Sequence, residues 1–283
     1  MRNHYLPKYY LKGFSGNSGD YVCVYDKCRR SSFITHRNNV AIEAGFYPPE
    51  VDQRLANEIE GPANEVLVKV RQRNEITDDD KSVLAKYLLT MFKRVPRGKQ
   101  RVREQILETI HRSCHNEDRL VEMIMASNPR LANLAPENRD QVRRILRDQL
   151  DDLARDPQEV YLKHLQSDET DIAIPWMTTM TWQFLTFDDE PAFLTCDNPF
   201  YLTPIGLLKP QSEISFPISS NITLSATRRT RLGEGYISIS ERVVRQMNRR
   251  IAANATRFVY HSRYEDWILP FITKPKWRRA PVP

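Results

Sequence analysis

The chain of 283 residues has little glycine, with 9 glycines against 18 prolines. It contains no G-x-G-x-x-G motif and no Walker-type loop, which excludes the glycine-rich loops that cradle phosphate in many nucleotide-binding proteins. It also has no apolar run approaching the roughly 20 residues that a membrane-spanning helix needs. We therefore expect neither a glycine-rich phosphate loop nor a membrane partner.

Cysteine is scarce as well. The four cysteines match no zinc template, because Cys23 and Cys28 are five positions apart and Cys114 and Cys196 do not form a second pair. The opening MRNHYLPKYYLKGF lacks the uninterrupted apolar region of a secretory signal. These features predict reduced thiols in a cytoplasmic protein.

The formal charge of +6 is distributed unevenly. Nine arginines lie between Arg228 and Arg263, and only Glu234 and Glu241 oppose them there. The stretch 151–197 is instead acidic. A basic C-terminal third suits a polyanion such as nucleic acid. The alternative is a solvated surface that the acidic stretch balances in space.

Local patterns predict a short helix and a hairpin at the start of the chain. Pro7 suits a helix start, and Gly13 is expected to end that helix in the left-handed conformation. Residues 21–25 are rich in aromatic and β-branched side chains, which favours a strand. Residues 32–35 would form the returning strand.

The middle of the chain reads as helical. Apolar residues recur at steps of three and four between Val51 and Val70, which defines one buried helix face. Thr77 is a good N-cap for a helix that continues to Phe92. Further helices are expected over 102–125 and 142–165.

From Ile172 onward the pattern changes to strands. Residues 177–187 and 192–196 read as a hairpin, because Asp188 to Pro191 breaks the pattern between them. The remaining elements are strands over 216–218, 221–226, 236–240 and 257–260 and a helix over 241–255. This order predicts an α+β fold, with an N-terminal hairpin, a central helical bundle-like region, and a C-terminal antiparallel β region with a closing helix.

Several short segments, taken together, form a recognisable set. They are Asn3–Phe14, Val24–Asp26, Glu43–Tyr47, Ile59–Gly61, Phe92–Pro96, Thr195–Pro199, Met247–Arg250, Ala253–Ala255 and Phe258–Val259. The set resembles the family called domain of unknown function 4238. The resemblance covers about residues 3–262, which predicts one domain over 1–262 and a basic tail over 263–283. It implies positions and boundaries, and it implies no activity.

Three polar residues in the first half of these segments are candidates for chemistry. His4 can donate or accept a proton near neutral pH, or it can bond to a backbone carbonyl. Glu60 and Arg94 lie at the edges of two apolar helix faces. They would either form a structural ion pair or hold a phosphate together with a metal ion or a water molecule.

Four more candidates lie in the second half. Asp197 and Asn198 follow an expected strand, where catalytic side chains are common, although Asp and Asn also cap turns. Asn248 interrupts the apolar positions of the last helix, so it would bind a ligand or bridge the backbone of a neighbouring loop. Asn254 would bind a ligand or cap that helix.

We hypothesise a phosphodiesterase or nuclease that acts on nucleic acid or a nucleotide. His4, Glu60 and Asp197 would be catalytic, and Glu60 and Asp197 would also bind a divalent metal such as Mg²⁺ or Mn²⁺. The residues expected to bind substrate are Arg94, Asn198, Asn248 and Asn254. Those expected to bind nucleic acid are Arg242, Arg245, Arg249 and Arg250.

Two other hypotheses stay open. The chain would be a noncatalytic module that binds nucleic acid or another ligand, in which case a basic surface suffices. Alternatively it would be a structural or interaction protein, with each polar candidate buried and bonded to the backbone.

Overall fold

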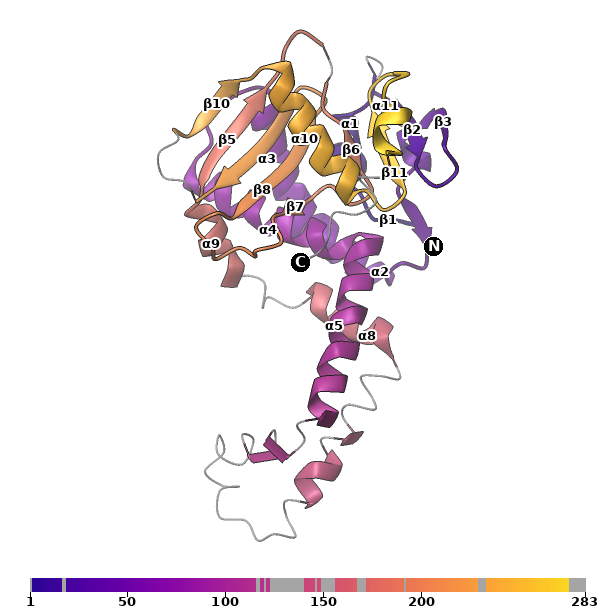
Figure 1. The fold of residues 1–283 in the computed structure, drawn as a ribbon, viewed down its shortest axis with the longest axis vertical. Coiled ribbons are helices and arrows are strands. Elements are labelled where there is room, and N and C mark those ends of the chain that lie inside the picture. Colours follow the sequence, from indigo (N-terminus) through magenta and orange to yellow (C-terminus); the bar gives the residue numbers. More distant parts are fainter. Residues whose placement is uncertain are drawn as a thin grey trace. The chain divides into compact units, whose positions relative to one another are not determined.

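The computed structural model describes residues 2–16, 19–115, 118–119, 121–122, 140–145, 147–148, 156–166, 172–190, 192–228 and 233–274. The chain divides into two compact units, one of Met1–Arg97 with Asp168–Pro283 and one of Gly98–Ser167. All the described strands belong to the first unit, and most of α5 (Pro96–His115) and α8 (Pro157–Gln166) belong to the second. Figure 1 shows these elements coloured along the sequence.

The first unit contains a five-stranded sheet. Its strand order is β10 (Gly235–Ser238), β5 (Thr181–Thr186), β9 (Ile222–Thr227), β8 (Glu213–Ser219) and β7 (Tyr201–Leu202). Neighbouring strands are antiparallel except β10 and β5, which are parallel. With its helices, this sheet confirms the α+β class.

A second sheet joins the two ends of the chain. Its order is β3 (Ser31–His36), β2 (Tyr21–Asp26), β11 (Phe258–His261) and β6 (Thr195–Cys196), and all pairs are antiparallel. The predicted N-terminal hairpin is confirmed as β2 and β3. Strands from the C-terminal region extend it, and β1 (Arg2–His4) pairs separately with β4 (Ile42–Ala44).

Helices of the first unit flank these sheets. They are α1 (Lys8–Lys12), α2 (Pro49–Arg54), α3 (Gly61–Arg71), α4 (Asp78–Arg94), α9 (Ile174–Thr178), α10 (Glu241–Asn254) and α11 (Ile268–Ile272). A π-helical segment, Leu55–Glu60, connects α2 to α3, and a 3-10 helix spans Arg37–Asn39. No helix in the described part of the chain is long and apolar enough to cross a membrane.

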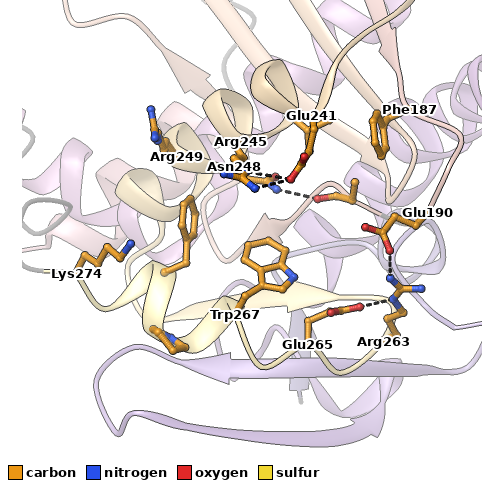
Figure 2. A pocket seen from close by; sticks show the side chains of 14 residues that line it. Phe187, Glu190, Glu241, Arg245, Asn248, Arg249, Arg263, Glu265, Trp267 and Lys274 are labelled. Carbon is orange, nitrogen blue, oxygen red and sulfur yellow. Dashed lines mark hydrogen bonds and ion pairs between the residues drawn. The ribbon is translucent and has the colours of Figure 1, made fainter.

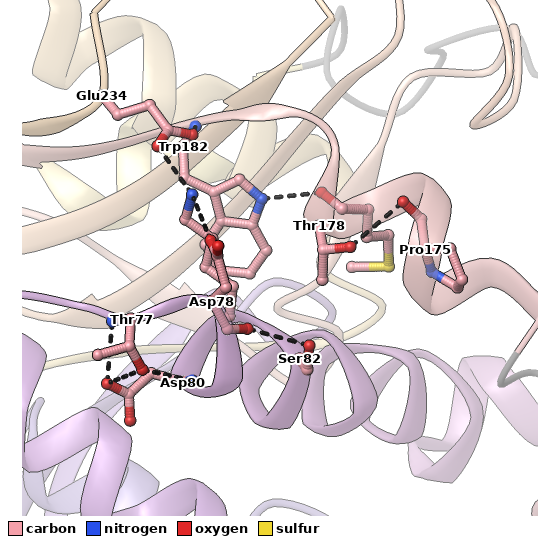
Figure 3. Close-up of polar contacts among 10 residues, drawn as sticks. Thr77, Asp78, Asp80, Ser82, Pro175, Thr178, Trp182 and Glu234 are labelled. Atoms are coloured by element: carbon pink, nitrogen blue, oxygen red, sulfur yellow. Dashed lines mark hydrogen bonds and ion pairs between the residues drawn. The ribbon is translucent and has the colours of Figure 1, made fainter.

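The start of α4 confirms the predicted cap. The Thr77 hydroxyl accepts from the Asp80 N–H at 3.2 Å, and the Asp80 carboxylate accepts from the Thr77 N–H at 3.1 Å. Figure 3 shows this reciprocal pair, and it also shows Trp182, whose indole N–H donates to the Met177 carbonyl oxygen at 2.9 Å. The Trp182 backbone N–H donates to Glu234, which joins the start of β5 to the start of β10. The Glu234 side chain therefore links the starts of β5 and β10.

The five-stranded sheet is covered on both faces. Phe216 lies in register with Leu224, and Leu224 with Phe184, so these three share one face. On that face the Phe216 ring is 6.0 Å from the ring of Tyr87 in α4. The next residue of β5, Leu185, points to the other face and packs against Met247 of α10.

Helix α10 packs against both sheets. Val244 and Met247, in its first half, belong to the cluster that contains Leu185 of the five-stranded sheet. Its second half belongs to a cluster with the four-stranded sheet and α11, made of Cys23, Tyr25, Leu194, Cys196, Ile251, Ala252, Ala255, Val259, Ile268 and Ile272. Residues of α11, which follow the predicted domain boundary at 262, therefore still belong to the core. The predicted domain over 1–262 stays a prediction, and residues 275–283 of the predicted tail lie outside the described residues.

The predicted hairpin over 177–187 and 192–196 is wrong. Residues Ile174–Thr178 form α9, β5 pairs with β9 and β10, and β6 pairs with β11 in the other sheet. The N–H groups of Ala192 and Phe193 do not pair with β5, because both bond to the Ser220 carbonyl oxygen, at 2.8 and 2.9 Å. Turn residues alone did not reveal that the second strand has a different partner.

The left-handed conformation predicted for Gly13 is also wrong. Its φ is −67°, an ordinary helical value. Space is the actual constraint, since a Cβ at Gly13 would lie 2.6 Å from the Ile218 carbonyl oxygen and 2.7 Å from Nη2 of Arg71. Arg71 reaches this point to donate to the carbonyl oxygens of Tyr9 and Tyr10, at 3.2 Å each.

The helix predicted over 102–125 is confirmed as α5 as far as His115. The single helix predicted over 142–165 is wrong, because Asp156 is not helical and instead caps α8, where its carboxylate accepts from the N–H groups of Gln158 and Glu159. Residues 116–117, 120, 123–125, 146 and 149–155 of these two predictions lie outside the described residues. The predicted strands over 216–218, 221–226, 236–240 and 257–260 are confirmed as β8, β9, β10 and β11, and the predicted helix over 241–255 as α10.

Candidate functional site

Helix α10 presents two different faces. Its apolar residues recur at steps of three and four, which buries Val244, Met247 and Ile251. Arg242, Arg245 and Arg249 follow the same spacing on the opposite side, and all are exposed. The fold therefore turns three of the four predicted nucleic-acid-binding arginines toward solvent.

Beside α10 lies a pocket of about 650 Å³. Its walls come from α10, from the segment after β5 and from the segment that runs from β11 through α11. The described lining residues are Phe187, Glu190, Ala192, Glu241, Val244, Arg245, Asn248, Arg249, Arg263, Glu265, Trp267, Pro270, Phe271 and Lys274. Figure 2 shows the pocket from close by, with Trp267 near the middle of the view. This volume is in the range of small-molecule sites.

The lining carries four cations and three carboxylates. Arg245 pairs with Glu241 at 2.6 Å along the exposed side of α10. Arg263 contacts both Glu190 and Glu265, and Figure 2 shows it between these two carboxylates. The lining therefore has one positive charge in excess, and its cations lie on both sides of the pocket.

Aromatic side chains also line the pocket. The rings of Trp267 and Phe271 are 5.6 Å apart at 75°, an edge-to-face pair within one turn of chain. Trp267 remains 43% exposed although it is the largest side chain of the lining. An exposed indole inside a pocket is available to stack on a flat ring.

Asn248 shapes the pocket wall. Its amide nitrogen donates to the Ala192 carbonyl oxygen at 2.8 Å, and its amide oxygen accepts from the Leu194 N–H at 3.0 Å. The side chain is buried, with 2% exposure. These contacts are the backbone bridge that the sequence left open as an alternative to ligand binding. Asn248 thus anchors the segment after β5 to α10.

Asp197 is held by the backbone. Its two carboxylate oxygens accept from the N–H groups of Thr256, Arg257 and Phe258 at 2.8, 2.8 and 3.0 Å. Burial raises the pKa of the Asp197 carboxyl, and the three N–H groups act against that rise. The contacts close the turn between α10 and β11, as a capping aspartate does.

Asn198 and Asn254 bind each other's backbone. The Asn198 amide donates to the Asn254 carbonyl oxygen at 3.0 Å, and the Asn254 amide donates to the carbonyl oxygens of Asn198 and Phe200 at 2.5 and 2.9 Å. This reciprocal pair fixes the end of α10 to the chain after β6. Neither residue is part of the described pocket lining.

A second polar centre lies around Arg94. Its guanidinium donates to the Glu60 carboxylate, to the His4 carbonyl oxygen at 2.6 Å and to the Tyr47 hydroxyl at 2.8 Å. Burial lowers the pKa of Arg94, but the charge and hydrogen bond of Glu60, together with the nearby Tyr47 and Tyr87, raise it overall. The structure thus brings the side chains of Glu60 and Arg94 together with the backbone of His4.

The side chain of His4 bonds elsewhere. Its Nε2 lies 3.2 Å from the Asn38 carbonyl oxygen, which is the backbone contact considered from the sequence. Partial burial and the charge of Lys8 lower the pKa of His4. His4 is therefore neutral near pH 7.

The two predicted metal ligands, Glu60 and Asp197, each bond to other groups of the protein. Glu60 is paired with Arg94, and Asp197 accepts three backbone N–H groups. Within the described residues, no group of three or more His, Cys, Asp or Glu side chains is placed to hold a metal ion. A metal role for Glu60 and Asp197 stays a prediction.

Arg250 differs from the other α10 arginines. It pairs with Glu213 of β8, and its guanidinium lies 5.4 Å from the centre of the Tyr201 ring. These contacts lie on the side of α10 that faces the sheet. The structure therefore separates Arg250 from the arginines of the pocket.

A family model described as "Protein of unknown function (DUF4238)" matches residues 2–265, which is nearly the whole chain. The chain belongs to this family. No curated protein and no solved structure matches the chain. The family match confirms the resemblance seen in the sequence, and it assigns no reaction to the DUF4238 chain.

Sequence reasoning named only Arg245, Asn248 and Arg249 among the described residues that line the pocket. Trp267, Phe271 and Lys274 fell within the predicted tail over 263–283, and Glu190 was taken as a turn residue. The spacing of four between Trp267 and Phe271 was the available signal, because it places both rings on one face of a helical turn. The contact between α10 and the segment after β5 had no such signal.

Proposed function

We propose that this DUF4238 protein binds a ligand that joins an aromatic ring to a phosphate, either a nucleotide or a nucleotide within a nucleic acid. One observation carries the proposal: the pocket beside α10 combines the exposed indole of Trp267 with the cations Arg245, Arg249 and Lys274. An indole stacks on any base, and guanidinium groups bind phosphate. This is the noncatalytic binding function among the hypotheses from the sequence.

The size and charge of the pocket support a nucleotide. A volume of about 650 Å³ is within the span of pockets that enclose small ligands. The excess positive charge of the lining favours an anion. A cytoplasmic location is part of this proposal, and it agrees with the free thiols of Cys23, Cys28 and Cys196.

Calorimetric titration with adenosine 5′-monophosphate tests the proposal. Adenosine, which lacks the phosphate, and inorganic phosphate, which lacks the ring, are the paired controls. We expect the nucleotide to bind more tightly than either fragment. Equal affinity for nucleotide and adenosine, or no binding of the nucleotide, would overturn the proposal.

Two substitutions locate the binding. Trp267→Leu is expected to weaken nucleotide binding about tenfold, because stacking on one aromatic residue contributes about 1–3 kcal/mol. Trp176→Leu is the matched control, since Trp176 is also exposed but lies on α9, outside the lining. Equal losses in both variants would place the ligand elsewhere.

A phosphodiesterase or nuclease is the second candidate function. The observation that favours it is the Arg94 centre, where a buried guanidinium joins Glu60 to the strand of His4. Glu60 is the last residue of the π-helical segment, and such segments are often found at functional sites. In this proposal Arg94 would bind the phosphate.

Hydrolysis of short RNA and DNA, with Mg²⁺ or Mn²⁺ added, tests this candidate. We expect product to form with the unsubstituted chain and to be lost in Glu60→Gln. Glu58→Gln is the control, because Glu58 forms an exposed pair with Arg54. Product formation that Glu60→Gln leaves unchanged would remove the Arg94 centre from the reaction.

A further inference from the structure

The arginines of α10 extend beyond the pocket. Arg245 and Arg249 belong to the described lining, whereas Arg242 lies one turn further toward the start of the helix. Arg242 and Arg249 are seven positions apart, or about 10 Å along a helix axis. Three arginines spread over this length match a ligand that carries more than one phosphate.

We infer that the ligand is a single-stranded nucleic acid, with one base in the pocket and its backbone along the exposed side of α10. This inference rests on the proposed function, and it names the class of ligand for the same site. Successive phosphates would meet Arg249, Arg245 and Arg242, while the base of one nucleotide stacks on Trp267.

The charge along α10 supports a polyanion. The helix carries four arginines and only one acidic residue, Glu241. Arg245 pairs with Glu241, and Arg242 and Arg249 add two more arginines to the same exposed side. A row of cations at regular spacing is the arrangement that follows a phosphate backbone.

The position of Trp267 selects a single strand. Its indole lines the pocket between α10 and the Arg263 ion pairs (Figure 2). A base must leave its neighbours to enter such a pocket, which costs a few kcal/mol in a duplex and far less in a single strand. Base stacking on aromatic residues is the usual contact of single-strand-binding proteins.

The pocket is expected to tolerate different bases. Asn248 is the one side-chain amide in the described lining, and its oxygen and nitrogen already bond to Leu194 and Ala192. Stacking and phosphate contacts act on every nucleotide alike. We therefore expect similar affinities for oligonucleotides of different sequence.

Fluorescence anisotropy with labelled ten-nucleotide strands tests the inference. The probes are a single-stranded RNA, a single-stranded DNA of the same sequence, the DNA duplex, and adenosine 5′-monophosphate as an unlabelled competitor. We expect at least one single strand to bind tenfold or more tightly than the duplex and the mononucleotide. The two single strands show which sugar is preferred.

Arg242→Gln separates the inference from the proposed function. It should weaken oligonucleotide binding and lower the slope of log affinity against log salt by about 0.7, the value for one phosphate contact on a single strand. Binding of the mononucleotide should not change. Arg29→Gln is the matched control, because Arg29 is an exposed arginine in the turn between β2 and β3.

The outcomes are distinct. If the mononucleotide binds but single strands bind no tighter, or if the duplex binds equally well, the inference is wrong and the proposed function stands. The same holds if Arg242→Gln and Arg29→Gln behave alike. If neither the mononucleotide nor a strand binds, both are wrong.

Discussion

The side-chain amide of Asn248 donates to the carbonyl oxygen of Ala192 at 2.8 Å and so joins α10 to a segment from the other side of the pocket. Its oxygen also accepts from the Leu194 N–H. Sequence reasoning selected Asn248 because a polar residue interrupts the buried face of α10. The structure explains that interruption by two backbone groups that would otherwise be buried without a partner.

Replacement of Asn248 by alanine is expected to lower the free energy of unfolding by about 1–3 kcal/mol, because two buried backbone groups lose their partner. Urea denaturation measures this change. Gln246→Ala is the control on the same helix, where the side chain is exposed and the expected change is within about 0.5 kcal/mol. Equal midpoints for the two variants would contradict the role given to Asn248.

The Arg94–Glu60 pair leads to a second stability prediction. Glu60→Gln leaves the buried Arg94 charge without its counter-charge, and such a loss costs about 3–5 kcal/mol. The double variant Glu60→Gln with Arg94→Met should lose less than the sum of the single variants.

Glu58→Gln is the control for that pair. Glu58 and Arg54 form an exposed pair on the neighbouring turn, with side-chain exposures of 54% and 39%. Its loss is expected to cost less than about 1 kcal/mol. Additive losses in the Arg94 and Glu60 variants would show that the buried pair has no net coupling.

The lowered pKa of His4 leads to a prediction of how the free energy of unfolding depends on pH. Partial burial and Lys8 lower its pKa in the folded chain below the ordinary 6.5. The unfolded chain therefore takes up a proton at His4 at a higher pH than the folded chain does. The contribution of His4 to stability is complete above pH 6.5 and is lost as the pH falls below that value.

His4→Gln should accordingly reduce the fall in stability between neutral and mildly acidic pH. Urea midpoints at several pH values measure the difference between the variant and the unsubstituted chain. Above pH 7 the two pH profiles should run parallel, because His4 is neutral in both states there. Parallel profiles at acidic pH as well would contradict the direction assigned to the His4 pKa.

The close packing around Gly13 leads to a prediction about the cost of adding one methyl group there. Gly13→Ala keeps an allowed φ but places a Cβ 2.6 Å from the Ile218 carbonyl oxygen, so we expect a loss of about 1–3 kcal/mol. Gly233→Ala is the control, since nothing lies within 4 Å of a Cβ there. Thermal unfolding compares the two. Equal melting temperatures would mean that the segment around Gly13 moves aside without cost.

Much of the fold was predictable from local patterns. The helix from Asp78 was found because Thr77 and the acids after it satisfy its first N–H groups. The α10 helix and the β2–β3 hairpin likewise have complete signals within their own residues. Their partners are different, because β11 and β6 reach the hairpin from more than 150 residues away along the chain. No periodicity within one segment encodes such a pairing.

The candidate site was predictable only in part. The residue types of α10 pointed to a basic surface, and three arginines lie there as expected. Trp267 entered the site only through the fold, since α11 brings it beside α10. Asp197 shows the opposite case: its sequence is typical of both a catalytic strand end and a capped turn, and only the three N–H groups around it display the second.

A crystal structure of the chain with adenosine 5′-monophosphate tests the central claim most directly. The account predicts density for the base against the Trp267 indole, with the phosphate within hydrogen-bond distance of Arg245, Arg249 or Lys274. An empty pocket at a saturating nucleotide concentration, or a nucleotide bound at the Arg94 centre instead, would contradict it.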